Sequence, residues 1–66
     1  MKSKYYSIAR SVAKRTPLST PQVLSEISKV INVLIGFGYS SEKVDESITV
    51  EHIENIVMKK VKRGFY

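Results

Sequence analysis

The chain has 66 residues, 42% of them hydrophobic, with 11 basic residues, six acidic ones and a formal net charge of +5. A chain of about 60 residues buries only about 60% of its unfolded surface, so we expect one domain with a thin core. It contains no cysteine, which excludes disulfides and thiolate metal sites. The apolar content excludes a disordered chain. The longest apolar stretch, 30–37, is far below the roughly 20 residues of a membrane span.

The first element is a helix predicted over residues 4–15. Apolar side chains recur there at the i, i+3, i+4, i+7 spacing of one helical face: Tyr5, Ile8, Ala9, Val12 and Ala13. Pro17 disfavours helical geometry at Thr16 and should end the helix.

The second helix is predicted over residues 20–36. It is capped either by Ser19, with Gln22 at capping-box spacing, or by Thr20, followed by Pro21 at the first helical position. Eight large aliphatic residues leave this helix little surface for water, so it should be central or lie at a subunit contact. We assign the core or a dimer contact to Val23, Ile27, Val30, Ile31 and Leu34. A glycine, Gly36 or Gly38, should end the helix in a left-handed cap.

Residues 41–46 could add one helical turn, capped by Ser40 or Ser41. The third main helix is predicted over 49–63, with Thr49 as N-cap and Ile48 at hydrophobic-staple spacing from Ile53. The sequence therefore predicts an all-α fold, in which three main helices form one domain over 1–66.

The charges are strongly segregated along the chain. Nine of the 11 basic residues lie in 1–19 and 59–66, which contain no acid, and five of the six acids lie in 42–54. If the fold joins the two ends, they form a cationic surface that favours a polyanion such as nucleic acid. The candidate phosphate-binding residues are Lys4, Arg10, Lys14, Arg15, Lys59, Lys62 and Arg63. Lys60 points elsewhere on its helix, and Lys2 belongs to the same basic end. Tyr6, off the apolar stripe, could stack on bases.

Nothing in the sequence indicates catalysis or a cofactor. His52 is the only histidine, and a metal site needs three or four ligands, so we interpret it as a surface residue. There is no nucleophile elbow or glycine-rich phosphate loop. We therefore expect no enzymatic activity, no cofactor and no metal.

Two stretches resemble known families. Residues 11–19, Ser-Val-Ala-Lys-Arg-Thr-Pro-Leu-Ser, are similar to the turn between the first two helices of the HU/IHF family of bacterial histone-like DNA-bending proteins. The resemblance extends over 11–35 and implies dimerisation and DNA association, although the chain has no room for that family's β-arms. Residues 35–40, Ile-Gly-Phe-Gly-Tyr-Ser, resemble the turn of ubiquitin-associated-type three-helix modules, which implies a protein-binding adaptor.

The function expected from the sequence is that of a small basic DNA-binding or DNA-associated accessory protein of phage or nucleoid type. It would act through phosphate contacts, as a homodimer in the cytoplasm, with DNA favoured over RNA and no membrane partner. The alternative is a helical adaptor or inhibitor that docks on another protein through its acidic 42–54 region. A helix-turn-helix would have to read DNA with the first or third main helix, because the second is too apolar to enter a groove.

Overall fold

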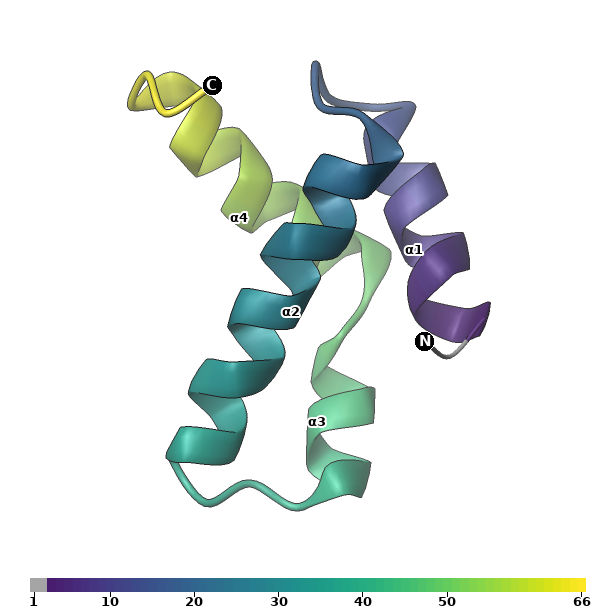
Figure 1. Cartoon of the computed structure of the whole chain (residues 1–66), viewed down its shortest axis with the longest axis vertical. Coiled ribbons are helices and arrows are strands. Elements are labelled where there is room, and N and C mark those ends of the chain that lie inside the picture. Colours follow the sequence, from purple (N-terminus) through teal and green to yellow (C-terminus); the bar gives the residue numbers. More distant parts are fainter. Residues whose placement is uncertain (1–2) are drawn as a thin grey trace.

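A computed structural model describes residues 3–66, and Lys2 lies outside this range. The described chain forms four helices and no strand: α1 (Ser3–Ala13), α2 (Thr20–Gly36), α3 (Ser41–Ser47) and α4 (Val50–Lys62). Figure 1 shows α2 in the middle, with α1 beside its first half and α3 beside its second half. α4 crosses behind the first half of α2, so that its last turn lies on the side away from α1. The predicted all-α class is confirmed. The prediction of three main helices is corrected to four, because residues 41–47 form a complete short helix.

The first helix ends two residues earlier than the predicted Arg15. The Thr16 hydroxyl donates to the Val12 carbonyl at 2.9 Å, and the Arg15 amide donates to the same carbonyl at 2.9 Å. These bonds take the place of the next helical hydrogen bond from the Thr16 amide, and Pro17 then directs the chain away from the helix. The connection to α2 is thereby fixed as a tight turn.

The ends of α2 follow the local signals in its sequence. Ser19 is the N-cap, and its amide donates to Gln22 Oε1 at 2.8 Å, so the capping-box alternative is confirmed. At the other end Gly38 adopts a φ of 88°, a left-handed conformation that glycine takes without steric cost. The helix therefore stops at Gly36, and the chain turns back toward α3.

The two later helices are capped by side chains. Ser40 Oγ accepts from the Lys43 amide at 3.3 Å, and Thr49 Oγ1 accepts from the His52 amide at 3.1 Å. Thr49 therefore lies just outside α4, as its predicted N-cap role requires. Gly64, with a φ of 85°, ends α4 as predicted, and the Phe65 amide donates to the Lys60 carbonyl at 3.0 Å.

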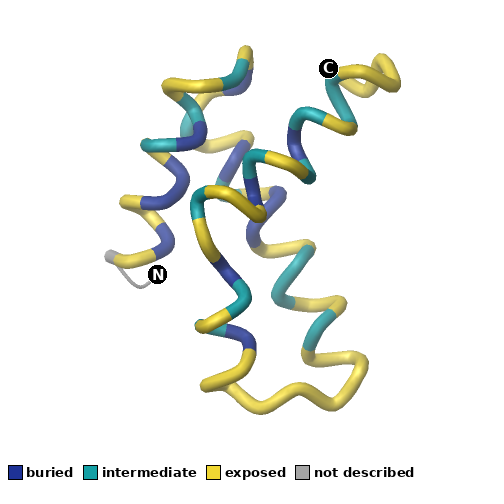
Figure 2. Tube along the Cα trace, turned by 180° about the vertical axis from the view of Figure 1, so that it is seen from behind, coloured by how far each residue is buried: buried dark blue, intermediate teal, exposed yellow. Residues whose placement is uncertain are grey.

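The hydrophobic core lies where α1, the first half of α2 and α4 meet, and Figure 2 shows the buried residues concentrated there. Val44 and Ile48 extend it toward α3. Its buried apolar members are Tyr5, Ile8, Ala9, Val12, Leu18, Val23, Ile27, Val44, Ile48, Ile53 and Val57.

The second half of α2 contributes less to this core. Val23 and Ile27 are fully buried, as expected, whereas Val30, Ile31 and Leu34 are only partly buried against the core. The reason is that α4 crosses α2 near its first half, so only α3 covers the rest (Figure 1). None of the helices in residues 3–66 has the length and apolar character needed to cross a membrane.

Candidate nucleic-acid interface

The outer face of α1 carries a shallow polar groove. Ser7, Arg10, Ser11 and Lys14 line a hollow of about 280 Å³. Their i, i+3, i+4, i+7 spacing places them on one side of the helix, away from the buried stripe that contains Ile8 and Val12. The groove thus presents two cations and two hydroxyl groups to solvent. The two cations were predicted as site residues from the sequence, but the two serines were not. Their helical spacing from Arg10 and Lys14 could have shown that all four residues share one side of the helix.

An aromatic ring adjoins this groove. The guanidinium carbon of Arg10 lies 5.9 Å from the centre of the Tyr6 ring, within the range of a cation–π interaction. Tyr6 is 50% exposed, whereas Tyr5 is 9% exposed. The assignment of Tyr5 to the core and Tyr6 to the surface is confirmed. Arg10 therefore lies over the Tyr6 ring and stays exposed to solvent.

Two other predicted cations of this end, Lys4 and Arg15, make intramolecular contacts at the surface. The Lys4 ammonium donates to the backbone carbonyl of Asp45. Arg15 Nη1 lies 3.6 Å from Glu54 Oε1, a shielded oxygen that has no hydrogen bond within the described residues. Both contacts connect the basic end to the acidic 42–54 region. Lys14, which directly follows α1, makes no ion pair within residues 3–66 and is exposed, so it is available to a partner.

The basic residues at the end of α4 form a separate group. Lys59, Lys62 and Arg63 are exposed, and Figure 1 places the last turn of α4 on the opposite side of α2 from α1. The structure therefore arranges the two basic ends as two surfaces, one on each side of α2. Lys60 points away from the other three, as its position on the helix predicted. Its ammonium contacts Glu26 on α2.

Glu26 forms a polar cluster that the sequence analysis did not identify. Its side chain is 1% exposed, and Lys60 Nζ lies 2.5 Å from its Oε1. Tyr66 donates its hydroxyl to the other carboxylate oxygen, which Lys29 approaches to 3.4 Å. Burial raises the pKa of Glu26, whereas the hydrogen bonds from Lys60 and Tyr66 lower it. Because the lowering effects together outweigh burial, the pKa lies below its ordinary value. The cluster ties the end of the described chain to α2.

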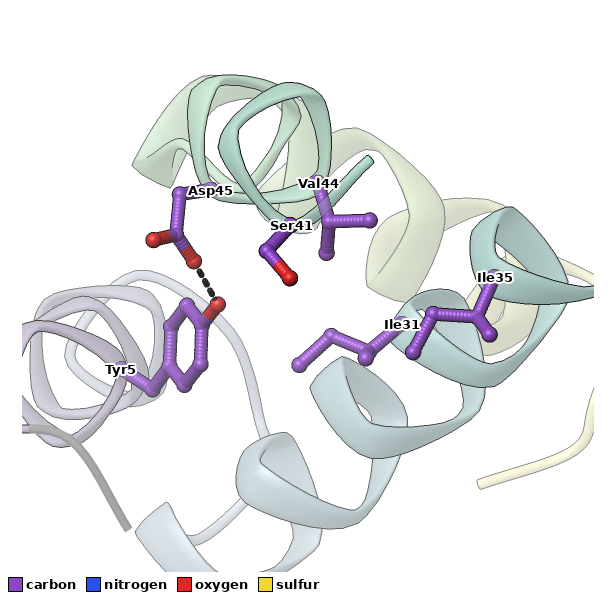
Figure 3. Close-up of a pocket in the computed structure, with 6 residues that line it drawn as sticks. All are labelled: Tyr5, Ile31, Ile35, Ser41, Val44 and Asp45. Carbon is purple, nitrogen blue, oxygen red and sulfur yellow. Dashed lines mark hydrogen bonds between the residues drawn. The ribbon is translucent and has the colours of Figure 1, made fainter. Parts of the chain in front are cut away.

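A second hollow lies between α2, α3 and the start of α1 (Figure 3). Its volume is about 120 Å³, and its lining consists of Tyr5, Ile31, Ile35, Ser41, Val44 and Asp45. At its edge the Tyr5 hydroxyl donates to the Asp45 carboxylate. This hydrogen bond, together with burial, raises the pKa of Tyr5 to about 12. The lining of the hollow is mixed: Ile31, Ile35 and Val44 are aliphatic, whereas Ser41, Asp45 and the Tyr5 hydroxyl are polar.

Metal ligands do not gather in the part of the chain that the structure describes. No group of three His, Asp or Glu side chains lies close enough there to hold a metal ion. His52 is exposed in the first turn of α4, where the sequence placed it.

Comparison with known proteins adds no relative: no protein-family model, no curated protein and no solved structure matches the chain.

Proposed function

We propose that the protein binds nucleic acid, and DNA in particular, through phosphate contacts made by the outer face of α1. The observation that supports this most is the groove in which Arg10 and Lys14 alternate with Ser7 and Ser11. Guanidinium, ammonium and hydroxyl groups are the side-chain donors that phosphate oxygens accept from. α1 also contains no acidic residue, so no carboxylate on the helix competes for these donors.

The length of the groove suits more than one phosphate of a strand. Ser7 and Lys14 are separated by seven residues, or about 10.5 Å along a helix that rises 1.5 Å per residue. One DNA strand rises about 3.4 Å per nucleotide along the duplex axis, so the groove is long enough to contact more than one phosphate of a strand. Such contacts fix a duplex against the protein without reading its bases. We therefore expect binding without sequence preference, in keeping with an accessory protein.

The decisive measurement compares two exposed lysines that differ only in their place on the molecule. Lys14 lines the groove of α1, whereas Lys43 is exposed on α3, among the acids of the 42–54 region. Lys14→Gln and Lys43→Gln change the net charge equally. Fluorescence anisotropy with a duplex should be recorded between about 50 and 200 mM salt, where phosphate contacts dominate the affinity.

The expected result is a salt-dependent affinity whose log–log slope falls by about one for Lys14→Gln and stays unchanged for Lys43→Gln. The proposal fails if the wild-type protein binds neither DNA nor RNA at low salt. It also fails if both variants weaken binding equally, since the effect would then come from net charge and not from the groove. If there is no binding at all, the adaptor alternative, with Glu42, Asp45 and Glu46 as its contact residues, would be tested next.

A further inference from the structure

The exposed ring of Tyr6 continues the row of cations on the outer side of α1. Tyr6, Arg10 and Lys14 are spaced four residues apart, so they are neighbours in one row, each about 6 Å from the next along the helix axis. Lys14 directly follows α1, but its amide still donates to the Arg10 carbonyl at 3.2 Å, which keeps it in that row. The row therefore has an aromatic ring at one end and an ammonium group at the other.

Neither core packing nor hydrogen bonding inside the fold accounts for an aromatic side chain at this position. Tyr6 is 50% exposed, whereas its neighbour Tyr5 is 9% exposed and belongs to the core. The Tyr6 hydroxyl makes no hydrogen bond within residues 3–66. The Arg10 guanidinium lies over the Tyr6 ring, with its carbon 5.9 Å from the ring centre. Since half of the residue is exposed, the ring has surface left for a second, planar partner.

The bases of nucleic acid are planar groups that stack on such a ring. Proteins that bind single strands combine a cationic groove, which follows the phosphates, with aromatic side chains on which the bases stack. Here the groove is lined by Ser7, Arg10, Ser11 and Lys14, and Tyr6 adjoins it. Inside a duplex, neighbouring bases already cover both faces of a base, and taking it out of the stack costs free energy. An unpaired base is therefore the partner that suits this ring.

We propose that the α1 surface prefers single-stranded DNA, with one unpaired base stacked on Tyr6 while Arg10 and Lys14 contact the adjacent phosphates. This inference rests on the proposed phosphate contacts of α1 and adds to them the class of strand that binds best. Every base has a face that can stack, so the preference is for unpaired nucleotides and not for a particular base.

The test is fluorescence anisotropy with two oligonucleotides of equal length, a thymidine strand and an abasic strand that carries the same phosphates without bases. The wild type should bind the thymidine strand at least about fivefold more tightly, the factor that corresponds to about 1 kcal/mol of stacking. Tyr6→Leu should lose this factor on the thymidine strand and leave the abasic strand unaffected, whereas Tyr6→Phe keeps the ring and should bind like the wild type. Tyr39→Leu is the matched control, since Tyr39 is 49% exposed but lies between α2 and α3.

The salt dependence separates this inference from the proposed function. Tyr6 carries no charge, so Tyr6→Leu should leave the slope of log affinity against log salt unchanged, whereas Lys14→Gln lowers it. Circular dichroism should show the same helix content in all variants.

Three results would overturn the stacking of a base on Tyr6 while leaving the phosphate contacts intact. The first is equal affinity of the wild type for the thymidine and abasic strands. The second is an equal loss on both strands in Tyr6→Leu, since the ring would then act only by holding Arg10 in place. The third is an equal loss in Tyr6→Leu and Tyr39→Leu. A wild type that binds no strand at low salt would overturn the proposed function, and this inference with it.

Discussion

Lys60 on α4 reaches the buried carboxylate of Glu26 on α2, with 2.5 Å between Nζ and Oε1. The two residues are 34 positions apart in the sequence, so this contact fixes the position of α4 against α2. The carboxylate is almost fully shielded, whereas the lysine side chain is 34% exposed. The pair is therefore asymmetric: the acid depends on its partners for solvation, and the lysine can still reach water.

This asymmetry predicts that the acid matters more to stability than the lysine does. Lys60→Met leaves the shielded carboxylate with fewer donors, but Tyr66 and Lys29 remain. Glu26→Ala removes the acceptor of all three and leaves a gap in α2. We expect Glu26→Ala to lower the free energy of unfolding by about 2 kcal/mol. This is less than the roughly 3–5 kcal/mol of a fully buried pair, because Lys60 can turn to solvent.

Urea denaturation measures how much Glu26→Ala and Lys60→Met each lower the free energy of unfolding. Glu51→Ala serves as control, since Glu51 is exposed in the first turn of α4 and such surface changes usually stay within about 0.5 kcal/mol. Equal destabilisation by the Glu26 and Glu51 substitutions would show that the buried cluster contributes nothing specific.

The same cluster predicts a loss of stability in acid. The pKa of Glu26 in the folded protein lies below its ordinary value of 4.5. A group whose pKa is lowered on folding stabilises the fold above its unfolded pKa, and this contribution is lost as the pH falls through the folded pKa. The free energy of unfolding should therefore decline below about pH 4.5. In Glu26→Gln this decline should be shallower, as measured by urea denaturation at several pH values. An unchanged slope would assign the acid sensitivity to the other carboxylates.

The contact between Tyr5 and Asp45 predicts the opposite dependence at high pH. The Tyr5 hydroxyl donates to the Asp45 carboxylate, and its pKa is raised from 10.0 to about 12. A raised pKa contributes stability that is complete below pH 10 and is lost as the pH rises toward 12. Absorbance of tyrosinate should show a late transition toward pH 12, and Tyr5→Phe should reduce its amplitude. An unchanged amplitude in Tyr5→Phe would assign the late transition to Tyr66 alone, whose pKa the hydrogen bond to Glu26 also raises.

Local features of the fold were predictable from the sequence because their physical causes are local. The capping residues Ser19 and Thr49 lie three residues from their partners: the Ser19 amide donates to the Gln22 side chain, and Thr49 Oγ1 accepts from the His52 amide. The apolar stripe of the first helix follows from the helical period alone. The end of α1 was placed two residues late, because the Thr16 hydroxyl competes for the Val12 carbonyl, a bond that apolar periodicity does not report.

The polar contacts between helices could not be predicted in the same way. Glu26 interrupts an apolar helix, and nothing near it in the sequence indicates that Lys60 and Tyr66 would surround it. Tyr5 and Asp45 are 40 positions apart. The charge pattern likewise gave the two basic ends but not their arrangement on separate sides of α2, which depends on the direction in which α4 crosses the core.

That arrangement gives a further prediction about DNA binding. Arg10 on α1 and Lys14 directly after it form one exposed pair, and Lys59 and Lys62 on α4 form another. Figure 1 shows α1 and the last turn of α4 on opposite sides of α2. If one duplex contacts both, replacing either pair by glutamine should lower the salt slope by about two. Distant sites without shared partners add, so the fourfold variant should show the sum of the two losses. Anisotropy titrations at several salt concentrations test this. A fourfold variant no weaker than Arg10→Gln/Lys14→Gln would confine the DNA to α1, whereas full retention of affinity in that double variant would move the interface to α4.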